Sequence, residues 1–409
     1  MIHPVLSIIG RPNALDREVS ALSVSALLHS SPAALVDPVR AAASLHLEQF
    51  RTTVWIVMMA AQIAVLAYFW SSGSSARLRD WLRARARPEF AVRFCFGALV
   101  AGIDRLAAFI PLAVEYRYMR ILDLNSILFR SWLVEWIGAT LIAMLVAGCI
   151  AAVVLWLADR THQWYLYTIA GVIGFTLLIT YANPVAIAPA YSYFSSVQFT
   201  QPLERDLAQL EGRAGVHVSV LQQDISRQTH VDSAYVMGWG ATQRVVIADT
   251  TLAGSTPAEI RFLFARAIAW IAAADGLHVA LVQGGFLVLG TALAVFISDR
   301  IGFRRDDDPV SRLALLGAVM GCVYLIAVPF YNGYVRNVDR MTDTAAIALV
   351  PDRAAAIRLE VRRSDQALLP LCPNPFVYWY FDARVPPGTR ISNLQDQPDY
   401  CAGVPRQRR

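Results

Sequence analysis

The sequence predicts a mainly α-helical, polytopic membrane protein: a bundle of about six spanning helices that carries a small α+β domain. Its composition is 56% hydrophobic and 16% charged, whereas soluble domains contain about 25% charged residues. The mean hydropathy is +0.44. Six apolar runs approach or exceed the roughly 20 residues that a spanning helix requires. A polar segment with short strand-like stretches separates the fourth run from the fifth.

The apolar runs place the expected membrane helices in order along the chain. They cover residues 54–71, 91–114, 134–158, 163–188, 279–298 and 312–331. The fourth run ends in "YANPVAIAP", where Pro184 and Pro189 should kink or stop the helix because proline lacks an amide hydrogen.

The polar segments divide the chain into five regions. We expect an extramembrane N-terminal arm at 1–50, a four-span membrane domain at 51–189, an α+β domain at 190–278, a two-span hairpin at 279–334 and a C-terminal segment at 335–409 that completes the α+β domain.

Within the α+β domain, periodicity indicates the elements. "PLERDLAQLEGRAG" places leucines on one helical face and ends in glycine. "VHVSVLQQDIS", "SAYVMGWG" and "TQRVVIADT" are typical of short strands. A last helix begins after Thr256, with Pro257 at its first position and Glu259 three residues after the cap. In the C-terminal segment, residues 352–365 predict a further helix.

Arginine supplies all the Lys and Arg charge, because the sequence contains no lysine. The arginines cluster in short loops beside apolar runs, as in "SSGSSARLRDWLRARARPEF" and "SDRIGFRRDDDPVSR". The lipid bilayer explains this charge better than nucleic acid does, and the positive-inside bias places both loops in the cytoplasm. We therefore expect a bacterial inner-membrane protein with a periplasmic α+β domain, where Cys372 and Cys401 could pair.

Several motifs carry a specific resemblance. "YANPVAIAPAYSYF", "DISRQTHVDSAYVMGWGATQRVVIADTTL" and "PAEIRFLFARAIAW" closely resemble the type I CAAX prenyl protease family, which are integral-membrane zinc metallopeptidases of the gluzincin kind. "RNVDRMTDTAAIAL" and "FDARVPPGTRI" resemble two further motifs of that family, and the similarity spans roughly residues 35–395. The resemblance implies a metallopeptidase-like α+β domain and a ring of helices around a chamber.

The resemblance places the family's H-E-x-x-H motif on "RAIAW". In that motif two histidines one helical turn apart bind zinc, and the glutamate acts as general base. Here Arg266 stands at the first histidine, Ala267 at the glutamate and Trp270 at the second histidine. Arginine and indole have no lone pair for a metal, and alanine cannot accept a proton. The motif is therefore degenerate.

The other family positions are partly retained. Asp339 and Asp343 match the family's E-x-x-x-D, which supplies the third zinc ligand and a supporting carboxylate. The remaining matches are Arg384 at a histidine, Arg390 at an arginine, Ser233 at an asparagine of the substrate-binding edge strand, and the retained Ala234 and Tyr235.

An arginine at the metal position suggests an ion pair. If Asp339 is buried it needs a positive partner, because an unpaired buried charge is very costly. We expect Arg266 to pair with Asp339, with Asp343 or with both. The alternative is that Arg266 extends to the membrane surface or solvent, which leaves Asp339 with Arg336 or Arg340.

Two functions follow from these residues. The first is a catalytically inactive pseudo-protease without metal or other cofactor, which binds a peptide or lipid-modified partner or regulates a relative. The second is a divergent zinc metalloendopeptidase with non-standard ligands, for example His278, Asp275 and Asp339, although no two of the seven histidines stand three or four residues apart. A third idea is that the emptied chamber passes or stores a lipid.

Overall fold

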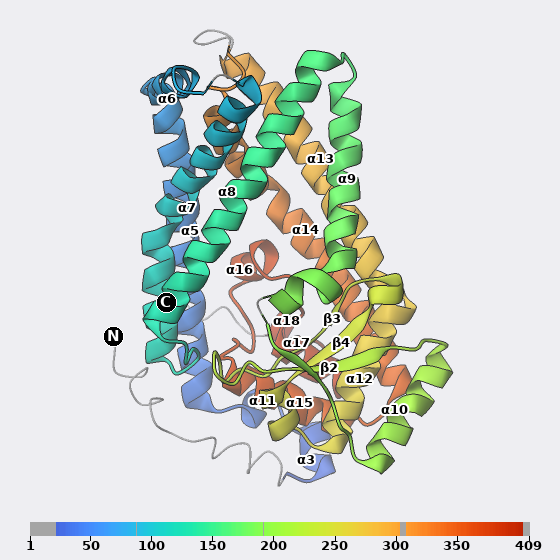
Figure 1. The fold of residues 1–409 in the computed structure, drawn as a ribbon. Helices are drawn as coiled ribbons and strands as arrows, with labels where there is room; N and C mark the ends of the chain where they lie inside the picture. Colours follow the sequence, from blue (N-terminus) through green and yellow to red (C-terminus); the bar gives the residue numbers. More distant parts are fainter. Residues whose placement is uncertain (1–21, 87, 191, 303–307, 404–409) are drawn as a thin grey trace.

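A computed structural model of the chain describes residues 22–86, 88–190, 192–302 and 308–403. Six of its helices are long and apolar enough to cross a membrane, which confirms the predicted helical bundle. They are α5 (Pro38–Ser71), α7 (Glu89–Ile121), α8 (Phe129–Arg160), α9 (Trp164–Ala182), α13 (Asp275–Gly302) and α14 (Leu313–Leu349). The bundle occupies the upper part of Figure 1, and the small sheet lies below it.

The shorter helices lie at the two ends of the bundle. They are α3 (Val24–His29), α4 (Pro32–Leu35), α6 (Ser74–Arg83), α10 (Gln201–Ala214), α11 (Asp249–Gly254), α12 (Pro257–Ala272), α15 (Arg353–Gln366), α16 (Pro375–Tyr380), α17 (Pro387–Leu394) and α18 (Tyr400–Gly403). The arginine-rich α6 lies at the end opposite the sheet (Figure 1), where Arg83 pairs with Asp308 at 2.5 Å.

Four strands form one small sheet. These are β1 (Phe194–Ser196), β2 (Ser219–Gln223), β3 (Ala234–Met237) and β4 (Arg244–Ala248), in the order β1-β2-β4-β3. β2 and β4 are parallel, and the outer strands pair antiparallel. The three expected strands are present, whereas the three-residue β1 is too short to carry a recognisable alternation. β3 is an edge strand whose inner neighbour is β4.

Three expected region boundaries fall inside continuous helices. One of them, at residue 278, lies within α13, which begins at Asp275. α5 begins at Pro38, directly after Asp37 caps its N-terminus, and so runs through the boundary at residue 50. α14 likewise continues past residue 334 to Leu349. Part of the expected N-terminal arm is also buried, because Leu27 and Leu35 belong to the core of the α+β domain; residues 1–21 lie outside the described part of the chain.

Proline explains how the fourth span ends. α9 stops at Ala182, and a π-helical turn follows over Asn183–Ile187, with Pro184 buried inside it. A proline without an amide hydrogen cannot continue the α-helical ladder. The chain then leaves the bundle to enter β1.

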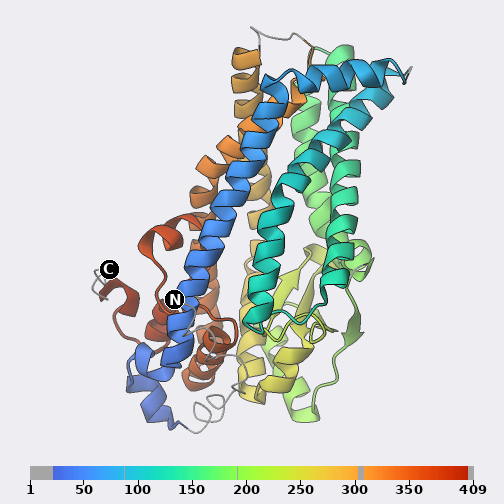
Figure 2. The ribbon, with the colours of Figure 1, turned by 90° about the vertical axis from the view of Figure 1, so that its left-hand side faces the viewer.

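The core of the α+β domain joins segments from across the sequence. The predicted apolar face of α10 is buried through Leu203, Leu207 and Leu210, which join one cluster with residues of α12, α15 and α17. Figure 2 shows α5 descending from the bundle beside this domain. Because α12, α14, α15 and α17 all contribute to this core, side chains on these helices can meet in one place.

Candidate functional site

The local sequence of α12 fixes the position of Arg266, Ala267 and Trp270. Thr256 and Glu259 form a capping box at the start of the helix, which satisfies its first amide groups and fixes where the helix begins. Arg266 and Trp270 then lie one turn apart and line the same cavity as Ala267. Ala267 is buried.

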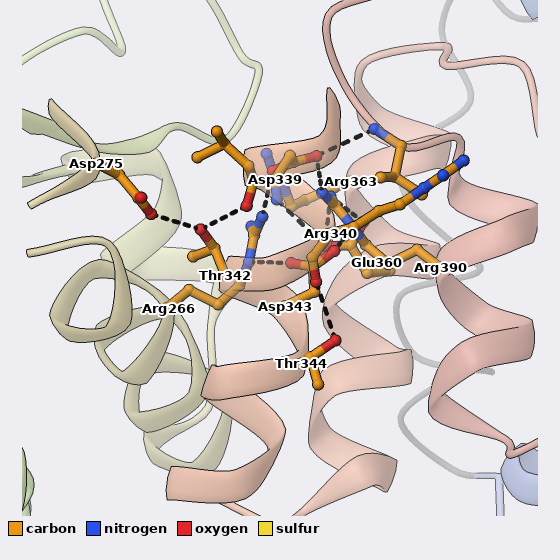
Figure 3. Close-up of polar contacts among 12 residues, drawn as sticks. Arg266, Asp275, Asp339, Arg340, Thr342, Asp343, Thr344, Glu360, Arg363 and Arg390 are labelled. Carbon is orange, nitrogen blue, oxygen red and sulfur yellow. Dashed lines mark hydrogen bonds and ion pairs between the residues drawn. The ribbon is translucent and has the colours of Figure 1, made fainter. Parts of the chain in front are cut away.

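Arg266 reaches both carboxylates of α14 (Figure 3). Its Nη2 donates a hydrogen bond to Asp339 Oδ1 at 3.0 Å. Its Nε lies 2.7 Å from Asp343 Oδ1, in a contact that is an ion pair by distance without the angle of a hydrogen bond. Each of the three side chains is 16% exposed. α14 can present both carboxylates to one partner because residues four apart share a helix face.

A second guanidinium holds the same two carboxylates from the other side. Arg390, on α17, donates from Nη2 to Asp339 Oδ2 at 2.5 Å and from Nε to Asp343 Oδ2 at 2.7 Å. The backbone amide of Val385 adds a hydrogen bond to Asp339 Oδ2 at 3.0 Å. Asp339 and Asp343 are therefore enclosed between two arginines.

Helix α15 contributes two charged residues that sequence reasoning missed. Arg390 Nη1 lies 3.3 Å from Glu360 Oε2, and Arg363 Nη1 lies 3.3 Å from Glu360 Oε1. Burial alone would raise the pKa of Glu360, but the guanidinium groups of Arg390, Arg363 and Arg266 lower it to about 2. The E-x-x-R spacing of Glu360 and Arg363 is the only local signal, and it is typical of ordinary helix surfaces.

The two arginines considered as alternative partners of Asp339 bind elsewhere. Arg336 Nη1 donates to the carbonyl of Tyr378 at 2.7 Å and also to the carbonyl of Asp382. Arg340 Nη2 donates to Tyr378 Oη at 3.0 Å. Among the described residues, the partners of Asp339 are therefore Arg266, Arg390 and the Val385 amide.

The predicted edge-strand residues border the cluster. Ala234 and Tyr235, on β3, line a cavity of about 280 Å³ together with Arg266, Arg384 and Trp270. Tyr235 Oη donates to Gln223 Oε1 at 2.9 Å. Ser233 lies one residue before β3, where its amide donates to Thr251 Oγ1 at 2.8 Å. Arg384 is exposed at the cavity.

Comparisons with known proteins show which family the chain belongs to. The family model for the CAAX prenyl protease N-terminal region, with five membrane helices, matches residues 33–192, and the model for peptidase family M48 matches residues 200–378. Together the two matches cover most of the sequence. This chain belongs to peptidase family M48, the family of the CAAX prenyl proteases.

One curated protein and one solved structure are similar to this chain. The chain is 24% identical over 301 residues to a Bacillus subtilis protein named "Uncharacterized metalloprotease YhfN", a match that covers 70% of this chain and 69% of that protein. The crystal structure of S. mikatae Ste24p superposes with a TM-score of 0.75 at 16% identity and covers 93% of each chain. The second likeness establishes a shared fold.

The residues around Asp339 and Asp343 do not fit zinc. Zinc sites use histidine, cysteine or carboxylate ligands, and the described part of the chain brings no three such residues together. Two arginines already hold Asp339 and Asp343. Asp275 accepts a hydrogen bond from Thr342 at 3.3 Å and does not complete a ligand set with Asp339.

Proposed function

We propose that this M48 protein is a catalytically inactive pseudo-protease that binds a peptide or a lipid-modified partner, or regulates an active relative. The contact of Arg266 with both Asp339 and Asp343 carries this proposal. A guanidinium group occupies the side of these carboxylates that a metal would need, and it stays protonated under all physiological conditions.

The chemistry of the motif turn supports the same proposal. A metal-bound water needs a general base to accept its proton, and Ala267 supplies none. Indole at position 270 donates a hydrogen bond but offers no lone pair. We therefore infer that the protein uses no metal or other cofactor, and that its scaffold serves binding.

A second candidate function is a divergent zinc metalloendopeptidase that recruits the metal through non-standard ligands. The printed name of the Bacillus relative, a metalloprotease, favours it. Such an enzyme would have to separate Asp339 from both Arg266 and Arg390 before zinc could bind. Since breaking buried ion pairs costs about 3–5 kcal/mol, we favour the inactive protein.

Zinc analysis of the purified full-length protein tests the proposal. We expect less than stoichiometric zinc by elemental analysis, and no change in content in the Asp339→Ala variant. Stoichiometric zinc that disappears in Asp339→Ala would establish the second candidate instead. A restored variant carrying Arg266→His, Ala267→Glu and Trp270→His provides the positive control, because it rebuilds the family motif on α12.

We also propose that the protein lies in the inner membrane of a bacterium with the sheet domain in the periplasm. The arginine-rich α6 lies at the opposite end of the bundle from the sheet (Figure 1), as the positive-inside bias requires for that orientation. Cys372 and Cys401 form a disulfide in the sheet domain, and disulfides persist in the periplasm.

A further inference from the structure

A separate cavity lies where α7 and α8 meet, and it shares no lining residue with the cavity beside β3. Its volume is about 420 Å³, and it is lined by Ala113, Tyr116, Arg117, Arg120, Leu128 and Phe129. The loop between the two helices is bonded to the sheet domain, because the Ser126 amide donates to the Gln228 carbonyl oxygen at 2.9 Å. The cavity therefore lies at the end of the bundle that adjoins the sheet domain.

This cavity is at the level of the membrane surface. The apolar run of α7 ends at residue 114 and that of α8 begins at residue 134, so the lining residues lie where the two spans leave the hydrocarbon region. Tyr116 and Phe129 both stack on Trp132, with ring centroids 5.0 Å and 5.6 Å from it. Aromatic side chains of this kind gather at membrane–water interfaces.

Two arginines one helical turn apart supply positive charge to the cavity. Arg117 is exposed and has no ion pair or hydrogen bond with any described residue. Arg120 Nη1 donates to the Ile127 carbonyl oxygen at 2.6 Å and to Tyr116 Oη at 3.2 Å. These neutral partners fix the guanidinium group of Arg120 but leave its charge uncompensated.

The acidic residues closest in sequence to the two arginines have other partners. Glu115 Oε1 accepts a hydrogen bond from Arg51 Nε at 3.1 Å, and Asp123 Oδ2 lies 3.7 Å from His230 Nδ1. None of the described residues that line the cavity is acidic. A guanidinium group offers a planar fork of donors that matches phosphate oxygens, so the cavity is suited to a phosphate group.

An apolar stripe on α7 leads from this cavity toward the middle of the span. Leu106, Ile110 and Val114 are 63%, 71% and 49% exposed. Their spacing of four residues places them on one helix face, which Arg117 continues. At 1.5 Å per residue, the distance from position 106 to position 117 is about 16 Å. This length matches one leaflet, which is about half of the 30 Å hydrocarbon core.

We propose that the cavity binds the headgroup of an anionic phospholipid from the leaflet on the sheet-domain side of the membrane. Arg117 and Arg120 hold the phosphate, and an acyl chain lies along the stripe of Leu106, Ile110 and Val114. A zwitterionic lipid fits less well, because its ammonium group would find no carboxylate among the described lining residues. The inference goes beyond the proposed function and holds whether or not the protein binds zinc.

Photolabelling of the full-length protein in phosphatidylcholine nanodiscs tests the proposal. The nanodiscs contain a trace of phosphatidylglycerol or of phosphatidylcholine that carries a diazirine on the acyl carbon nearest the headgroup. Mass spectrometry of chymotryptic peptides then measures the label on residues 106–132, relative to the label on residues 163–188. We expect at least about fivefold more label from the phosphatidylglycerol probe, because each arginine near anionic lipid contributes about a fivefold factor in affinity.

Arg117→Gln should lower labelling by the phosphatidylglycerol probe about fivefold and leave labelling by the phosphatidylcholine probe unchanged. Arg117→Lys keeps the charge and should retain most of the label. Arg130→Gln is the matched control, since Arg130 is also exposed and follows Phe129 directly but does not line the cavity. This control should label as the wild type does, and equal thermal midpoints would exclude a loss of folding as the cause of any difference.

Four results would overturn the proposal. Equal labelling by the two probes in the wild type would show that the cavity does not select anionic lipid. Unchanged labelling in Arg117→Gln would remove Arg117 from the site. Equal losses in Arg117→Gln and Arg130→Gln would show a general attraction to interfacial charge. Displacement of the probe by excess soluble glycerophosphoglycerol would assign the cavity to a free phosphodiester instead of a lipid.

Discussion

At the scale of single residues, Arg266 supplies a fixed positive charge to the two carboxylates of α14. A metal dication between carboxylates exchanges with solvent and depends on ligand protonation, whereas a guanidinium is part of the chain. Arg266 and Arg390 hold Asp339 and Asp343 from two sides. The cluster therefore stabilises the packing of α12 against α14 and α17.

Removing the side-chain charge of Arg266 should destabilise the protein. We expect Arg266→Met to lower the free energy of unfolding by about 3 kcal/mol, the lower end of the range for breaking a buried pair, because Arg390 still neutralises the carboxylates. Arg261→Met on the same helix is the control. Its partner Asp206 lies 3.8 Å away and both side chains are well exposed, so its effect should stay below about 1 kcal/mol. Equal losses, measured by denaturant unfolding followed by tryptophan fluorescence, would contradict the buried pair.

The carboxyl group of Asp382 makes the stability of the protein depend on pH. Burial raises the pKa of Asp382 to about 6, against the opposing charges of Arg336 and Arg51, while Glu48 adds a further carboxylate nearby. A folded-state pKa above the ordinary value of 3.8 means that ionisation is costly in the folded state. This cost is present above pH 6 and disappears as the pH falls toward 4.

Asp382→Asn should therefore raise the thermal midpoint at pH 7.5 and leave it nearly unchanged at pH 4. Thermal unfolding of wild type and variant across this range measures the difference. A stabilisation that is constant from pH 4 to pH 7.5 would show that the carboxylate does not titrate in this window.

At the scale of elements, α17 depends on close packing at its first turn. Gly388 lies beside the disulfide between Cys372 and Cys401. A Cβ at this position would lie 2.7 Å from the Leu371 carbonyl oxygen and 2.8 Å from Cys401 Sγ. α17 also carries Arg390, so this glycine supports the position of a cluster residue.

Gly388→Ala should destabilise the protein by about 1–3 kcal/mol, the usual cost of overpacking a filled site. Gly212→Ala in α10 serves as the comparison, since its Cβ would meet no atom within 4 Å and alanine favours helix by up to about 1 kcal/mol. The two variants should shift the thermal midpoint in opposite directions, and a shift of Gly388→Ala toward greater stability would contradict the close contact.

At the scale of the whole molecule, the two ends of the bundle differ in their charge and in whether they carry a disulfide. The arginine-rich α6 and the disulfide-bearing sheet domain lie at opposite ends of six spanning helices (Figure 1). With an even number of spans, both ends of the described chain lie on one side of the membrane. The proposed orientation places that side in the periplasm.

Alkaline phosphatase fusions test the orientation, because this enzyme is active only where its own disulfides form. A fusion after Arg409 should be active, and a fusion after Arg85, directly behind α6, should be inactive at equal expression. The reverse pattern would place the sheet domain in the cytoplasm.

Much of the molecule is determined by local sequence. The six apolar runs, the capping box before α12 and the leucine face of α10 each depend on residues within one or two turns, and the structure contains all of them. The chemistry of Arg266, Ala267 and Trp270 is likewise a matter of residue identity, because none of these side chains can ligate zinc in any fold.

Only the tertiary structure decided how the charges meet. Glu360 and Arg363 look like an ordinary helical pair in the sequence, and Arg390 is 51 residues from Asp339. Their contacts depend on the packing of α12, α14, α15 and α17 around one core. Hydrophobic periodicity is a property of neighbouring residues, whereas a contact between distant residues arises only when the whole chain buries its apolar faces together.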